Sequence, residues 1–352
     1  MVRNSWALVA ILFITAAAPA QQRDTVYYRD HTAKPEKTAE FTGAVSEETV
    51  NGIKVKPQVG PERSFPVGDI VDVVYAPPRA LEIPFQPILN GESALRTGAA
   101  DKAKIDKLVK DYTTFVNNSL KDAKVPSLRR HIQYRLAVLK AALAEKREEQ
   151  NEAVRQFEQV RKEVAGSWQF VPLVRQEAQL LIDLERLDDA ARLLDEAGKT
   201  QGLAKELKQE LELGMIDLMI RAGKANEVEG RIAQALQMLP PTDPMATKLK
   251  VFQLGAQAGK GDIDKAVTQL QAIIDQSQEN SLKALAYNTL GDCYSAKGQK
   301  KEAMWKYMWV DMVYNQDKAE HVKAVERLAH VFKDLNDDAR AEKYKEKLKS
   351  IR

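Results

Sequence analysis

The chain has few of the residues that support chemistry at a metal or a thiol. Cys293 is the one cysteine among 352 residues, which excludes an intrachain disulfide. No histidine lies near it in sequence to act as a base, so a small helix residue is the favoured interpretation of this thiol. The four histidines show neither an HExxH motif nor paired ligand spacing: His31, His131, His321 and His330. We therefore expect no metal site, no cofactor and no catalytic residue.

A strong charge of either sign is also missing. Lysine plus arginine exceed aspartate plus glutamate by 53 − 50 = 3, and the charges are interleaved along the sequence. Nucleic acids are bound by concentrated basic surfaces, so nucleic acid and other polyanionic partners are disfavoured. With 44% hydrophobic and 29% charged residues, the chain is expected to be globular.

Long apolar runs are scarce as well, and the one at residues 6–18 follows Arg3 and precedes Ala18-Pro19-Ala20. A basic start, a short apolar run and a small-x-small site predict a secretory signal peptide over residues 1–20. A retained anchor is less favoured, because roughly 18 to 20 apolar residues are needed to span a bilayer. We expect an exported chain that begins at Gln21, is periplasmic or extracellular and has no membrane span.

Residues 21–77 have the alternating pattern of strands. Short runs rich in β-branched and aromatic residues occur at 25–29, 39–45, 53–57 and 69–75. Asn51-Gly52 predicts a type I′ hairpin turn between two of them. The interpretation is a small antiparallel β module, for which a half-open barrel of the SH3 or Sm-like kind is one topology. Prolines then cluster, so residues 78–100 are predicted to be a proline-containing linker.

From residue 101 to 352 the periodicity is helical. The segment Leu290–Val310 contains Cys293 and two of the four tryptophans, and it raises the question of whether the thiol belongs to an active-site loop or to a scaffold. Here Tyr287, Leu290-Gly291 and Tyr294 are followed, after a turn, by Ala303 and Tyr307. This spacing resembles the tetratricopeptide repeat, in which small residues allow two helices to cross closely and larger ones fill the surrounding space.

The period of this pattern recurs along the helical region. Taking the small residue that opens the second helix of each repeat as a marker gives Ala153, Ala190, Val228, Ala266, Ala303 and Ala341, with steps of 37, 38, 38, 37 and 38. The positions twelve before and four after each marker are small or apolar, except for Lys345 in the last repeat. The resemblance implies a mainly α protein, a right-handed α-solenoid of about six helical hairpins behind the β module. The period exceeds the standard 34 residues, which implies an altered superhelical twist.

In proteins that this pattern resembles, the concave face lined by the first helices binds an extended peptide or a partner helix. In two repeats the corresponding inward positions hold Lys248, Val251, Phe252, Leu285, Asn288 and Asp292. These residues are the candidate partner-binding set. The hypothesis is therefore a non-catalytic protein-protein interaction scaffold in the bacterial cell envelope, because exported tetratricopeptide proteins with short β modules look bacterial.

Trp305 and Trp309 share one helix face with Met308 and Met312, by i, i+3, i+4 and i+7 spacing. Contact with the next repeat is the favoured interpretation, and an exposed patch that docks a partner or self-associates is the alternative. Two further alternatives for the whole chain stay open. One is an envelope enzyme or enzyme accessory with its site in the β module, and the other is a self-assembling structural protein. Titratable candidates for the enzyme are Glu48, Asp69 and Asp72.

Overall fold

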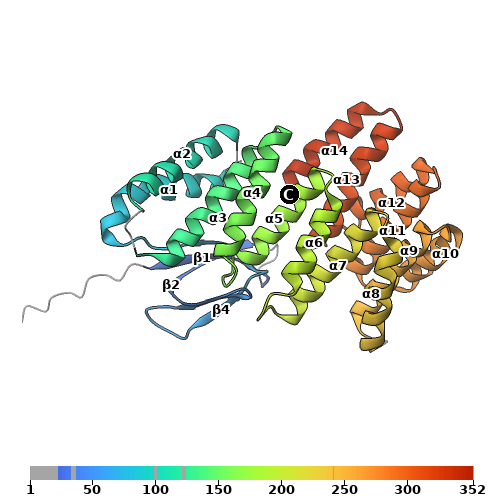
Figure 1. The fold of residues 1–352 in the computed structure, drawn as a ribbon, viewed down its shortest axis with the longest axis horizontal. Coiled ribbons are helices and arrows are strands. Elements are labelled where there is room, and N and C mark those ends of the chain that lie inside the picture. The colour runs from blue at the N-terminus through green and yellow to red at the C-terminus, as the bar shows by residue number, and fades with distance from the viewer. Residues whose placement is uncertain (1–22, 33–36, 99–100, 121–123, 241, 352) are drawn as a thin grey trace, which may run out of the picture. The chain divides into compact units, whose positions relative to one another are not determined.

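The computed structural model describes residues 23–32, 37–98, 101–120, 124–240 and 242–351 (Figure 1). The predicted signal peptide and its cleavage site lie outside the described residues. The chain divides into two compact units, the first ending at Gln176 and the second beginning at Glu177. Among the described helices, none combines the length and the apolar character that crossing a bilayer requires.

The first unit begins with five antiparallel strands, β1 (Asp24–Asp30), β2 (Lys37–Thr49), β3 (Gly52–Lys56), β4 (Arg63–Pro66) and β5 (Ile70–Val74). Their order in the sheet is β4-β3-β2-β1-β5. The long β2 pairs with β1 through its first half and with β3 through its second, as the bent strand of a partly open barrel does. The predicted antiparallel β module is therefore confirmed, and β4 is the strand that the sequence pattern missed.

The predicted type I′ turn at Asn51-Gly52 is wrong. Thr49 pairs with Gly52 across the hairpin, so the two loop residues are Val50 and Asn51. Gly52 instead begins β3 with a φ of 146°, and a Cβ on it would overlap the Phe65 carbonyl oxygen. The glycine is therefore required by the close approach of β4 rather than by the turn.

The predicted linker at residues 78–100 differs from the structure, because α1 (Arg79–Thr97) is a helix that contains Pro84 and Pro87. Each proline removes one hydrogen bond from a helix interior. Leu81, Phe85 and Ile88 are nevertheless buried along one face of α1, which packs against α2. Apolar burial outweighs the lost bonds, a balance that proline positions alone do not reveal.

Twelve further helices confirm the predicted pairs. The structure has α2 (Lys102–Asn118), α3 (Pro126–Leu143), α4 (Arg147–Glu163), α5 (Phe170–Asp183), α6 (Leu187–Gly198), α7 (Lys205–Arg221), α8 (Ala225–Met238), α9 (Pro244–Gly259), α10 (Ile263–Gln276), α11 (Asn280–Ala296), α12 (Lys300–Met312) and α13 (Lys318–Asp334). The last helix of the chain is α14 (Asp338–Ile351). The boundary between the two units falls inside α5. The three-part division at 21–77, 78–100 and 101–352 stays a prediction.

Each repeat marker is buried in the second helix of its pair: Ala153, Ala190, Val228, Ala266, Ala303 and Ala341. A Cβ on Gly291 would overlap the ring of Tyr307, which fixes how closely α11 and α12 cross. Lys345 in the last pair is exposed, as the terminal position of an array requires. In the second unit α7 contacts α9, α9 contacts α11 and α11 contacts α13, so successive first helices lie side by side as in a solenoid.

Candidate functional site

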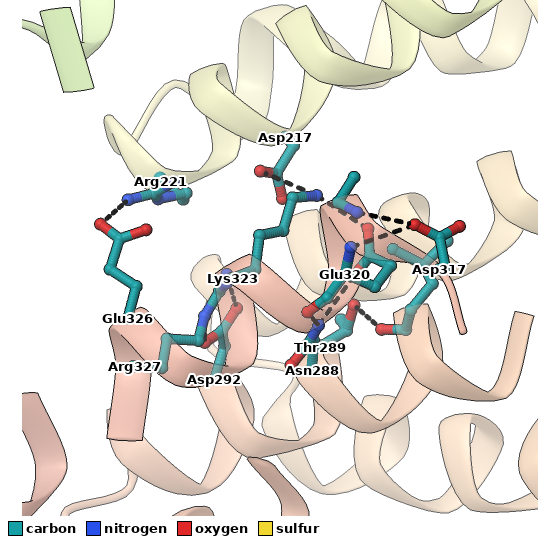
Figure 2. Close-up of polar contacts among 12 residues, drawn as sticks. Asp217, Arg221, Asn288, Thr289, Asp292, Asp317, Glu320, Lys323, Glu326 and Arg327 are labelled. Carbon is teal, nitrogen blue, oxygen red and sulfur yellow. Dashed lines mark hydrogen bonds and ion pairs between the residues drawn. The ribbon is translucent and has the colours of Figure 1, made fainter. Parts of the chain in front are cut away.

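The inner face of the second unit is formed by the first helices of its repeats. The inward positions Leu285 and Asn288 of α11, and the adjoining Thr289, recur one 38-residue step later in α13, where 285 + 38 = 323, 288 + 38 = 326 and 289 + 38 = 327. These residues are Lys323, Glu326 and Arg327. Figure 2 shows their side chains converging with Asp217 of α7 and Asp292 of α11. The structure therefore gathers charged residues from three first helices at one place.

Arg327 and Asp292 join α13 to α11. The Arg327 Nε donates to Asp292 Oδ1 at 2.6 Å and its Nη2 to Oδ2 at 2.7 Å, a bidentate pair. The Tyr307 hydroxyl of α12 donates to the same Oδ1 at 2.7 Å. Burial and then the Asp292 charge raise the pKa of Tyr307, so this phenol stays protonated and donates its hydrogen bond.

Two ion pairs join α13 to α7. Lys323 Nζ lies 3.2 Å from Asp217 Oδ2, and it also donates to Glu320 Oε1 at 2.9 Å. Arg221 Nη2 lies 3.4 Å from Glu326 Oε1. All of these side chains are mostly shielded from solvent, so salt and water screen them less than they screen surface pairs.

The charge states of Asp217 and Lys323 follow from their surroundings. Burial alone raises the pKa of Asp217, but the cations Lys323, Arg327 and Arg221 outweigh it and leave that pKa below its ordinary value. Burial alone lowers the pKa of Lys323, but Asp217 and Glu320 outweigh it and raise that pKa. Both groups are therefore charged at neutral pH.

Burial corrects the surface placement of four predicted partner-binding residues: Val251, Phe252, Leu285 and Asn288. Phe252 is 4% exposed and Asn288 is 2% exposed. The Asn288 Nδ2 donates to Glu320 Oε2 at 2.8 Å and to the Glu320 carbonyl oxygen at 3.0 Å. The spacing placed these residues on the inner side of the first helices, but it did not reveal that they are buried, with Lys323 beside Phe252 and Glu320 bonded to Asn288.

Lys248 and Asp292 are the predicted inner-face residues that remain partly open to solvent. Asp292 borders a cavity of about 630 Å³ that is also lined by Ser295, Tyr307, Arg327, His330, Val331, Lys333 and Asp334. Two nearby polar atoms, Asn288 Oδ1 and Arg327 Nη1, are buried and have no hydrogen-bond partner within the described part of the chain. The cavity is therefore lined by charged and hydrogen-bonding side chains that a partner could contact.

Trp305 and Trp309 are exposed by 58% and 46%, which contradicts the favoured interpretation that they pack against the next repeat. Met312 and Val313 are exposed beside them. The Trp309 ring stacks on Tyr287 at 6.1 Å between centroids. The alternative, an exposed aromatic patch, is therefore what the structure shows, while its use in binding or self-association stays a prediction.

The thiol of Cys293 is buried within α11. Burial, followed by the Asp292 charge, raises its pKa to about 12, so the thiol is protonated and unreactive at neutral pH. The interpretation as a small helix residue is confirmed. No group of three or more His, Cys, Asp or Glu is placed to hold a metal ion within the described ranges.

Of the three residues proposed for an enzyme in the β module, Glu48 and Asp72 both lie near the buried His131, whereas Asp69 lies apart. Asp69 pairs with His31 at the surface. Asp72 is buried and accepts from Arg96 Nη1 of α1 at 2.9 Å. Glu48 is held by Arg130, Ser127 and Tyr75.

A fourth carboxylate of the first unit, Glu92, is buried and has three donors. Arg135 donates from Nε at 2.9 Å and from Nη2 at 2.6 Å. The hydroxyl of Tyr112 donates to Glu92 at 2.7 Å. Each of these buried carboxylates is thus matched by an arginine: Glu48 and Asp72 join strands to α3 and α1, and Glu92 joins α1 to α3.

Comparison with known proteins found solved structures that resemble the chain distantly. A tetratricopeptide repeat protein from Parabacteroides merdae is 12% identical, with a TM-score of 0.45 over 76% of this chain and 93% of that chain. A Rap protein complexed with competence and sporulation factor is 13% identical, with a TM-score of 0.38 over 77% of each chain. NprR in complex with its cognate peptide NprX is 14% identical, with a TM-score of 0.33 over 76% of this chain and 77% of that chain.

No protein-family model and no curated protein matches the chain. The structural similarities are too distant to support an argument on function, so the repeat architecture rests on the helix pairs and buried markers described above.

Proposed function

We propose that the chain is a non-catalytic interaction scaffold of the bacterial cell envelope that binds a protein or a peptide on the inner face of its second unit. The observation that carries the proposal is the convergence of α7, α11 and α13 at the charged cluster beside the 630 Å³ cavity. Solenoids of helical hairpins bind partners along the face that their first helices line. The neutral, buried thiol of Cys293 favours binding over nucleophilic catalysis.

A site-specific cross-link tests the proposed surface. A photo-cross-linking residue replaces His330, which lines the cavity, in the full chain expressed in its native envelope. The matched control has the same residue at Lys343, an exposed position on α14. We expect a discrete adduct at His330 and none at Lys343, and mass spectrometry then identifies the partner.

Affinity for the purified partner completes the test. The variant Lys333→Glu reverses one exposed charge at the cavity, and Lys343→Glu reverses an exposed charge elsewhere. The first is expected to change the dissociation constant about fivefold or more, which corresponds to about 1 kcal/mol for a charge near a partner, and the second to leave it unchanged. Equal effects of the two variants would reject the inner face as the binding surface.

The proposed location depends on the N-terminal sequence motif. A basic start, the apolar run 6–18 and Ala18-Pro19-Ala20 support export with cleavage after Ala20. N-terminal sequencing of the chain recovered from the envelope is expected to begin at Gln21. A chain that starts at Met1, or that fractionates with the cytoplasm, would reject this part of the proposal.

A further inference from the structure

Asp217–Lys323 and Arg221–Glu326 connect helices that are distant in sequence. Asp217 and Arg221 are four residues apart on α7, and Lys323 and Glu326 are three apart on α13, so each helix presents both partners on one face. Asp217 also occupies the repeat position of Asp292, because 228 − 217 and 303 − 292 are both 11. The two ion pairs therefore join inner positions of two non-consecutive repeats.

Long polar side chains make this connection rather than close helix contact. The first helices that pack closely are α7 with α9, α9 with α11 and α11 with α13. Two ion pairs join α7 to α13, at 3.2 Å and 3.4 Å. Because desolvation offsets much of the attraction within a shielded ion pair, these two contacts add little net stability compared with apolar packing.

Two of the predicted binding residues, Phe252 and Asn288, lie next to side chains of α13. Lys323 Nζ lies 5.9 Å from the centroid of the Phe252 ring, and Glu320 accepts the hydrogen bonds of Asn288. Both covered residues belong to first helices, α9 and α11. Separation of α13 from α7 would move Lys323 away from the Phe252 ring, whereas Asn288 would stay bonded to Glu320 because α11 still packs against α13.

We propose that the two ion pairs are a clasp that closes the inner face of the second unit, and that a partner reaches Phe252 only after the clasp opens. This inference rests on the proposed function, because the event that the clasp controls is partner binding. The closed form then competes with partner binding. If about a tenth of molecules are open, removing the clasp tightens binding about tenfold, because the apparent dissociation constant is the intrinsic one divided by the open fraction.

Pulsed electron paramagnetic resonance measures the opening without any partner. Spin labels are attached to the full chain at Lys208→Cys on α7 and Lys333→Cys on α13, both exposed positions. The native Cys293 is buried and is not expected to react with the label. The distance distribution is recorded at low and at high salt.

Charge reversal of one pair gives the decisive comparison. Arg221→Glu and Glu326→Arg are measured singly and together, and Glu342→Lys on α14 is the control for reversal of a surface charge. We expect each single variant to populate longer distances at either salt concentration, and the double variant to restore the original distribution. Circular dichroism verifies that each variant is folded. The isosteric double variant Asp217→Asn/Glu326→Gln replaces any single variant that unfolds.

Identical distributions in all these chains, or single-variant changes that the double variant does not reverse, would overturn the clasp. Failure of the proposed function looks different. In that case the distances change as expected, but the cross-link at His330 yields no partner.

Discussion

Lys323 Nζ lies 3.2 Å from Asp217 Oδ2. This ion pair joins α13, the first helix of the last repeat, to α7, the first helix of the repeat three pairs earlier. Such a contact is absent from a model in which each repeat touches only its neighbours. It gives the second unit a link that depends on charge, and its pH dependence follows from the shifted pKa values.

The Asp217–Lys323 pair predicts loss of stability in acid. The pKa of Asp217 is lowered from 3.8, so its contribution is complete above that value and is lost as pH falls through the lower, folded-state pKa. The raised pKa of Lys323 predicts the converse, a contribution lost only as pH rises above 10.5. Urea unfolding is expected to show a smaller acid-induced loss of stability below pH 3.8 in Asp217→Asn than in the parent.

Gly291→Ala is expected to destabilise the α11–α12 pair by about 1–3 kcal/mol, because the new Cβ would overlap the Tyr307 ring. Gly230→Ala in α8 is the matched control, since no atom lies within 4 Å of its added Cβ. That change is expected to stabilise by about 0.5–1 kcal/mol through helix propensity. Chemical denaturation of both variants measures the difference, and equal effects would refute the close crossing.

Glu92→Ala is expected to cost about 3–5 kcal/mol, because Arg135 would lose its buried bidentate partner. Replacing both partners by apolar residues, as in Glu92→Leu/Arg135→Met, is expected to recover most of that loss. Glu47→Ala, at a surface pair with Lys54, is the control and should leave the denaturation midpoint unchanged. If the double variant were as unstable as Glu92→Ala, the two residues would have a structural role beyond their mutual pairing.

His131 predicts a second pH effect, located in the first unit. Burial lowers its pKa from 6.5, with the nearby Arg135 acting in the same direction and Asp72, Glu92 and Glu48 opposing it. The neutral imidazole therefore contributes stability that is complete above pH 6.5 and declines as pH falls through the depressed pKa. His131→Phe keeps a ring beside Tyr75 and is expected to show a smaller stability loss between pH 7 and pH 5. Parallel pH profiles would contradict the assignment.

Truncation to alanine is expected to affect stability little at Trp305 and strongly at Trp168. Trp305→Ala is expected to change stability by less than about 0.5 kcal/mol, because its side chain is largely exposed. Trp168→Ala is expected to cost about 3–5 kcal/mol, because Trp168 is buried and donates to the Tyr75 hydroxyl at 2.9 Å. Acrylamide quenching of the parent, compared with each variant, shows which ring the solvent reaches.

The repeat period in the sequence could have identified the inner-face residues that the sequence interpretation missed. Extending the spacing of Leu285, Asn288 and Thr289 by one repeat gives Lys323, Glu326 and Arg327. The same extension to α7 gives Asp217 from Asp292. Periodicity thus identifies the helix face, but it does not say which side chains meet across the solenoid, because that depends on how each repeat is rotated against the next.

The sequence by itself determined the helix pairs, their period and the buried markers, because small and apolar residues recur wherever two helices must cross. It also determined four of the five described strands, through their two-residue alternation, and missed β4. Only the tertiary structure decided that α1 forms despite its prolines, that Gly52 is needed by a neighbouring strand, and that Phe252 and Asn288 are covered while Trp305 is exposed. Local patterns follow from interactions within a few turns, whereas exposure and charge pairing depend on contacts between residues far apart in the chain.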